Sequence, residues 1–220
     1  MERHLDQELA DLKKQLLQMG TLVETAIFES LESLKELNAE RAKKLINDDK
    51  VIDEMENIID ERCLDLLALR QPMAVDLRFI TMSMNISTDL ERIADLAVDI
   101  AQRVLDLVGK PLLKPLVDIP SLAGLAQRMS KDALDAFVNK DADLAKSVIL
   151  NDHQADELRN LVQKELIEDY MVKDPSTVRR AVPLLLISRH LERICDHATN
   201  IAEDVIYMVE AKVVKHHPES

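Results

Sequence analysis

Two sixteen-residue segments, 101 residues apart, constrain the fold of this chain more than any other feature of its sequence. The segments ISTDLERIADLAVDIA, at 86–101, and ISRHLERICDHATNIA, at 187–202, share ten identical positions. Helical composition alone would not produce so many identities. A preceding segment aligns at an offset of 103, with the matched pairs Asn38/Asp141, Ala39/Ala142, Ala42/Ala145, Ile46/Ile149, Asp49/Asp152, Asp53/Asp156 and Glu54/Glu157. The chain is therefore a duplicated unit, and the two-residue change in offset falls at a turn.

Each copy of the unit has the pattern of three long helices. Apolar residues recur every three or four positions, and only seven prolines and three glycines interrupt the chain. The expected helices span 3–37, 40–69, 73–108, 121–138, 142–171 and 176–213, with a kink at Pro183. We therefore predict an all-α protein of two tandem pseudo-repeated three-helix bundles, with domains at 1–110 and 111–220. The proline-containing run near 111–120 is the expected hinge or boundary.

The strong negative charge limits the surfaces that this chain can bind. Its formal net charge is −13 at pH 7, and its sequence pI is about 4.9. Nucleic acid and anionic membrane would be repelled, so we expect neither as a direct ligand. The first residues do not form a basic head followed by an apolar core, and no apolar run approaches the roughly 20 residues of a membrane span. We therefore expect a cytoplasmic protein that reaches a membrane only through partners.

Four acid pairs survive the duplication, and three residues separate the members of each pair. The pairs are Asp49/Asp53 and Glu91/Asp95 in the first copy, and Asp152/Asp156 and Glu192/Asp196 in the second. Residues four apart lie along one stripe of a helix. Because short turns make the second and third helices of a copy antiparallel neighbours, folding about residue 71 sets the first two pairs at one level. Folding about residues 173–174 does the same in the second copy, provided that the two stripes face one groove.

Mutual repulsion predicts that each group of four carboxylates binds a cation. Like charges about 4 Å apart cost roughly 4 kcal/mol per pair at an effective dielectric near 20, so protons or metal ions have to intervene. Oxygen ligands suit Mg, Mn, Ca or ferric iron better than a structural zinc site, although zinc binding stays open. Asp99 extends the first row, but its counterpart is Asn200, and His190 is a further candidate at the second site. Alternatively, Arg92 and Arg193 neutralise the acids.

Signatures of catalysis are missing from the sequence. A di-iron carboxylate enzyme needs Glu-x-x-His motifs that face the core of the bundle, and the sequence contains none. The three glycines are isolated, so the chain has no glycine-rich phosphate-binding loop. We therefore expect a binding or regulatory protein rather than an enzyme. A carboxylate–metal redox enzyme is the weaker alternative.

The repeated motifs resemble those of the PhoU family. The likeness rests on the acid pairs, on LERIAD at 90–95 and LERICD at 191–196, and on VDLRFI at 75–80 and STVRRA at 176–181. It covers essentially the whole chain. It implies a cytosolic regulator of phosphate uptake that acts with the phosphate-specific ABC transporter and its ATPase subunit PstB. It also implies negative control of the phosphate regulon through a PhoR-type sensor kinase when phosphate is plentiful.

The resemblance further implies metal ions, including multinuclear iron clusters, on the acid pairs. The implied ligands are Asp49, Asp53, Glu91 and Asp95, with Asp99 at the edge of the first site, and Asp152, Asp156, Glu192 and Asp196, with Asn200 at the edge of the second. The competing hypothesis is a metal-independent helical adaptor whose acidic stripes bind basic residues of a partner. Long exposed helices are also compatible with a homodimer.

Overall fold

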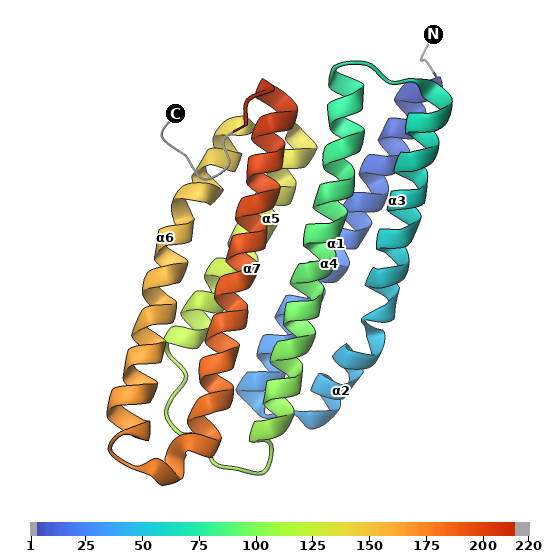
Figure 1. Cartoon of the computed structure of the whole chain (residues 1–220). Helices are drawn as coiled ribbons and strands as arrows, with labels where there is room; N and C mark the ends of the chain where they lie inside the picture. The colour runs from blue at the N-terminus through green and yellow to red at the C-terminus, as the bar shows by residue number, and fades with distance from the viewer. Residues whose placement is uncertain (1–3, 214–220) are drawn as a thin grey trace.

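The computed structural model describes residues 4–213, and all of its regular elements are helices (Figure 1). The first bundle contains α1 (His4–Glu36), α2 (Ala39–Asp48), α3 (Lys50–Arg70) and α4 (Val75–Leu107). The second contains α5 (Asp118–Asn139), α6 (Ala142–Glu165), a π-helical turn (Leu166–Met171), a 3₁₀ turn (Pro175–Thr177) and α7 (Val178–Glu210). The prediction of an all-α protein with two repeated bundles is confirmed.

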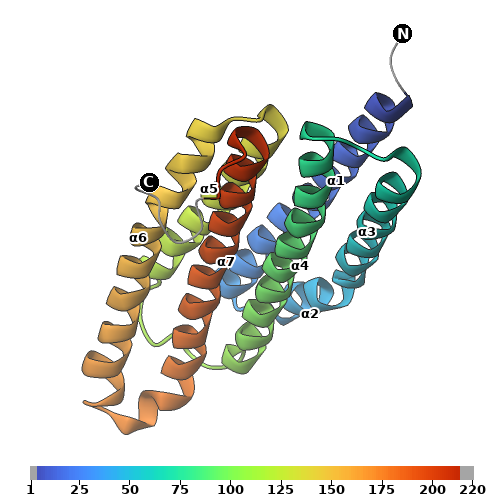
Figure 2. The same cartoon turned by 45° about the horizontal axis from the view of Figure 1, so that its top comes forward.

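The two bundles lie side by side, and their third helices meet in the middle of the molecule. Figures 1 and 2 show α4 and α7 antiparallel at this seam, with α1 and α5 behind them and α3 and α6 at the two outer edges. Leu90 and Ile93 of α4, like Leu191 and Ile194 of α7, are completely buried. Burying one such side chain stabilises the fold by roughly 1.5–3 kcal/mol, so the repeated apolar positions account for the shared architecture.

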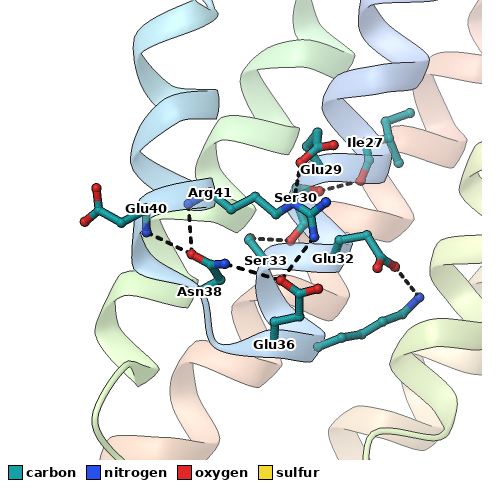
Figure 3. Close-up of polar contacts among 10 residues, drawn as sticks. Ile27, Glu29, Ser30, Glu32, Ser33, Glu36, Asn38, Glu40 and Arg41 are labelled. Carbon is teal, nitrogen blue, oxygen red and sulfur yellow. Dashed lines mark hydrogen bonds and ion pairs between the residues drawn. The ribbon is translucent and has the colours of Figure 1, made fainter.

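Matched turns open the second helix of each bundle. Leu37 and Lys140 both adopt positive φ angles, of 49° and 53°. The next residue caps the following helix: Asn38 Oδ1 accepts hydrogen bonds from the amides of Glu40 and Arg41, both at 3.1 Å. Asp141 Oδ1 does the same for two amides of α6 at 3.0 Å. Figure 3 shows the first of these caps and the Arg41 side chain beside it.

Arg41 fastens the start of α2 to the end of α1. Its Nε donates to Glu29 at 2.6 Å, and its Nη1 lies 3.1 Å from Glu36 (Figure 3). These contacts hold α2 in place, although α2 turns away from the axis of α3 (Figure 2). A pocket of about 660 Å³, lined by residues of α1, α2 and α3, lies at this bend.

The second helices of the two bundles differ from the expected continuous helices. The expected helix at 40–69 is broken at Asp49, which separates α2 from α3. The break follows Asn47 and Asp48, so three consecutive residues compete with the helix for backbone hydrogen bonds. The expected helix at 142–171 keeps its length but ends in the π-helical turn, and α7 continues through Pro183.

The segment between the bundles is fastened to the second bundle. Lys114 is only 7% exposed, although it lies in the irregular stretch between α4 and α5. Its Nζ pairs with Glu165 at the end of α6 and lies 3.6 Å from Asp118. A buried lysine needs such partners, because an unpaired buried charge is costly.

Among the described residues, no helix is long and apolar enough to span a membrane.

Candidate functional site: two acidic grooves

The acid pairs line two grooves at equivalent places in the two bundles. We call the first groove the surface between α3 and α4 that carries Asp49, Asp53, Glu91 and Asp95. We call the second groove the surface between α6 and α7 that carries Asp152, Asp156, Glu192 and Asp196. Each groove therefore receives two carboxylates from each of its two walls, as the folding of the hairpins predicts.

Carboxylates in the first groove repel one another across the groove. Burial, reinforced by the charges of Asp53 and Asp95, raises the pKa of Asp49 to about 6. Burial and the charge of Asp95 raise the pKa of Glu91 to about 7, with smaller contributions from Glu56 and Asp53. Asp49 lies at the break before α3 and Asp95 lies on α4, so the acids of the two walls are close enough to influence one another.

Arg92 compensates this repulsion only in part. It lies 3.4 Å from Glu91 and 3.4 Å from Asp95, and its side chain is 56% exposed. Ion pairs of this kind contribute little, because water screens them. Glu91 Oε2 is buried and accepts no hydrogen bond within the described chain, although it is the atom that Arg92 Nε approaches to 3.4 Å. The first groove therefore has a buried carboxylate oxygen that is near one exposed arginine but has no hydrogen bond.

A different arginine bridges the acids of the second groove. Arg159 of α6 donates through Nη2 to Asp156 at 3.0 Å and to Glu192 of α7 at 3.1 Å. The same guanidinium thus joins the two walls of the groove. Burial, followed by the charges of nearby acids, still raises the pKa of Asp196 to about 6 and raises that of Asp152. The second groove is therefore partly neutralised by the protein itself.

The carboxylates suit a hard cation in chemistry, but they are not assembled around one. Across residues 4–213, no three acidic, histidine or cysteine side chains are grouped closely enough to hold a metal ion. The donors are all oxygens, they repel one another, and one of them has no hydrogen-bond partner. A metal ion would therefore have to draw the side chains together, and in the second groove it would also have to displace Arg159.

The outermost candidates, Asp99 and Asn200, lie at the seam between the bundles. Asp99 is 3.7 Å from His190 of the opposite bundle, and Asn200 donates to Asp89 at 3.2 Å. A stripe of residues four apart drifts by about 40° per step around a helix, so Asp99 turns from the groove toward α7. Metal ligation by Asp99 or Asn200 remains a prediction that would require these contacts to break.

Sequence reasoning missed the two residues that do most to organise these polar surfaces. Asp89 accepts from Asn200 and lies 2.7 Å from Nδ1 of His197, an arrangement that depends on how the bundles pack. Arg159 could have been found, because it occupies the position that Glu56 has in the first copy. Replacement of an acid by a base between two copies of a unit marks a change in local chemistry.

Comparisons with known proteins place the whole chain in one family. The model of the PhoU domain matches twice, at residues 16–104 and 119–205. A phosphate-specific transport system accessory protein PhoU homolog from Aquifex aeolicus is 41% identical over 96% of both chains. The homolog from Pseudomonas aeruginosa is 38% identical over 98% of this chain and 89% of its own.

Solved structures agree with the sequence relatives. The crystal structure of PhoU from Pseudomonas aeruginosa has a TM-score of 0.91 and 38% identity, and the match covers 95% of this chain and all of that one. The phosphate transport system regulatory protein PhoU from Streptococcus pneumoniae has a TM-score of 0.90 and 32% identity, over 96% and 100% of the two chains. The relatives are named as accessory or regulatory proteins, so the family is one of regulatory proteins rather than of enzymes, as expected. With two domain matches and full-length relatives, the chain belongs to the PhoU family.

Proposed function

We propose that this protein is a cytosolic, metal-binding accessory protein of a phosphate ABC transporter that restrains the phosphate regulon. Relatives named as phosphate-specific transport system accessory proteins support the transport role. The proposed partners are the PstB-like ATPase of the transporter and a PhoR-like sensor kinase. The negative charge of the chain favours basic surfaces on both partners.

The observation that carries the metal proposal is the repulsion in the first groove, which Arg92 relieves only in part. Its acids come from both walls, the pKa values of Asp49 and Glu91 are raised by burial and by neighbouring acids, and Glu91 Oε2 has no hydrogen-bond partner within the described residues. A bound cation would allow all of these carboxylates to ionise together. Iron is the metal that the family resemblance favours, and Mg, Mn, Ca and Zn are the alternatives.

A metal ion would act here as a charge switch. Asp49, Asp53, Glu91 and Asp95 would hold it in the first groove, and Asp152, Asp156, Glu192 and Asp196 in the second. Bound metal would change an acidic surface into a neutral or positive one, and so alter which partner surface docks there. The protein itself would contribute the position of the carboxylates, which the helices of one bundle hold on the two walls of each groove.

The metal proposal is tested by elemental analysis of protein purified without chelator or affinity tag. We expect stoichiometric metal in the wild type and loss of first-groove metal in the combined variant Asp49→Asn, Asp53→Asn, Glu91→Gln and Asp95→Asn. Circular dichroism should show unchanged helicity, because the substitutions keep side-chain size. Full metal content in this variant would reject the first groove as the site.

The regulatory proposal is tested in cells and with membranes. Co-purification from membranes at high and low phosphate should recover the ATPase and the kinase, and deletion of the gene should release the phosphate regulon from repression. The metal-independent adaptor is the second candidate, which the bridge from Arg159 favours because it shows that arginine can satisfy these acids. An adaptor of this kind would bind its partners equally well after metal removal.

A further inference from the structure

A pocket of about 520 Å³ opens on the second groove, and three arginines line it. Arg159 comes from α6, while Arg189 and Arg193 lie one turn apart on α7. Glu192 and Asp196 also line the pocket. Its size falls within the range of small-molecule sites, which runs from about 300 to 1,000 Å³.

The hydrogen-bonding capacity of Arg189 and Arg193 is largely unused, and that of Arg159 is unused only at one nitrogen. Arg189 and Arg193 are exposed, and neither forms an ion pair with a carboxylate in the part of the chain that the structure describes. Arg159 uses Nη2 for its two carboxylates and Nη1 for Asn160 at 2.9 Å, but its buried Nε has no hydrogen-bond partner. A buried donor without an acceptor is costly, so an added acceptor at this point would be stabilising.

The acids of the pocket do not cancel the positive charge. Glu192 already accepts a hydrogen bond from Arg159. The lining contains three arginines and two acids, Glu192 and Asp196, and Asp156, the other partner of Arg159, is not part of it. The lining of the pocket alone therefore has one positive charge in excess, beside the remaining acids of the second groove and within a chain whose net charge is −13.

The first bundle shows that this pocket belongs to one copy of the unit. At the positions of Arg159, Arg189 and Arg193 it has Glu56, Thr88 and Arg92. Only one of the three positions is therefore basic there, and Arg92 contacts Glu91 and Asp95 of its own helix. The arginine-lined pocket is consequently a property of the second groove rather than of the repeated fold.

We propose that this pocket binds a phosphate oxyanion, either inorganic phosphate or the phosphoryl group of a small monoester. Guanidinium forks match the oxygens of phosphate, and their bonds to it are charge-assisted. Converging arginines from two helices would hold a dianion that a lone surface arginine would not. This inference rests on the proposed role in phosphate control, for which it supplies a ligand, but it does not require metal binding.

Equilibrium dialysis with labelled inorganic phosphate tests the proposal on full-length, chelator-treated protein. We expect saturable binding that weakens roughly tenfold or more in the double variant Arg189→Thr and Arg193→Gln. The matched control is Arg92→Gln, which removes the equivalent first-bundle arginine and should leave binding unchanged. All three substituted side chains are exposed, so thermal melting should confirm that the variants are folded.

Competition identifies the source of the phosphoryl group. Tighter binding of glycerol phosphate than of inorganic phosphate would assign the pocket to a phosphorylated metabolite, and the reverse order would assign it to the free ion. Acetate at the same ionic strength should not displace either ligand. Absence of saturable binding, displacement by acetate, or retained binding in the double variant would overturn the proposal. Because metal is absent throughout, such a failure would leave the metal proposal for the first groove intact.

Discussion

The two grooves have the same carboxylate pattern but opposite ways of compensating it. In the first groove, Glu56 adds to the repulsion that raises the pKa of Glu91. In the second, the equivalent position is Arg159, which hydrogen-bonds to acids on both walls. One replacement in a duplicated unit thus gives the second groove an arginine bridge between its walls where the first groove has a further acid.

We expect the hydrophobic cores of the two bundles to be alike, in contrast to the charges of their grooves. Ile93 and Ile194 occupy equivalent positions on α4 and α7, and both are completely buried. We expect Ile93→Ala and Ile194→Ala each to lower the free energy of unfolding by about 2–5 kcal/mol, as is usual when a cavity is left in a core. Urea denaturation measures the loss. Costs that differ by several kcal/mol would show that the two bundles diverged in packing as well as in charge.

Exchanging the two divergent residues should exchange the properties of the grooves. Arg159→Glu should destabilise the metal-free protein by roughly 1–3 kcal/mol, because two charge-assisted hydrogen bonds are lost and repulsion is added. It should also raise the cation affinity of the second groove about tenfold. The reciprocal Glu56→Arg should weaken cation binding in the first groove. Isothermal titration with Mn²⁺ separates the two effects, and unchanged affinities in both variants would show that these residues do not set the difference.

The stability of the metal-free protein should fall as pH rises from about 5 to about 7.5. The pKa values of Asp49 and Glu91, at about 6 and about 7, exceed the values of roughly 4 for unfolded carboxyls. The folded state therefore binds more protons in this window, and its stability declines as they leave.

Scanning calorimetry in chelator should record this decline as a drop in Tm of roughly 2–4 °C. The double variant Asp49→Asn and Glu91→Gln should make the decline shallower, because both titrating groups of the first groove are removed while the raised pKa values of Asp152 and Asp196 in the second groove still contribute. A Tm of the wild type that rises across the same range would contradict the account of the groove.

The smallest expected difference is at the seam. Asp89 lies 2.7 Å from His197 and is 16% exposed, whereas Asp99 lies 3.7 Å from His190 and is 46% exposed. Asp89→Asn should therefore cost about 0.5–1 kcal/mol and Asp99→Asn less, because exposed pairs are screened. Thermal denaturation at neutral pH compares them. A larger cost at Asp99 would reverse the assignment of the stronger contact.

Local and repeated features of the fold could be predicted from the sequence. Periodicity placed the long helices, and the matched Asn38 and Asp141 marked the turns because helix caps depend on neighbouring residues alone. The break at Asp49 was also present as a signal, since Asn47, Asp48 and Asp49 form a run of capping residues that the second copy interrupts with Leu150. No comparable sequence signal predicted the π-helical turn at Leu166–Met171.

The candidate site was predictable only to the level of helix faces. Spacing brought the acid pairs together because antiparallel hairpins fix the level of each residue. The drift of Asp99 toward α7, and the contacts of Asp89 with His197 and Asn200, depend on the packing of one bundle against the other. Arg159 reaches across its groove through a long flexible side chain, so its two partners could not be deduced from sequence spacing.

The most direct test of the difference between the grooves is a crystal structure with one molar equivalent of Mn²⁺, located by anomalous scattering. We expect the ion between α3 and α4, bound by acids of the first groove, with the Arg159 bridge in the second groove intact. An ion found first between α6 and α7, with Arg159 displaced, would contradict the account.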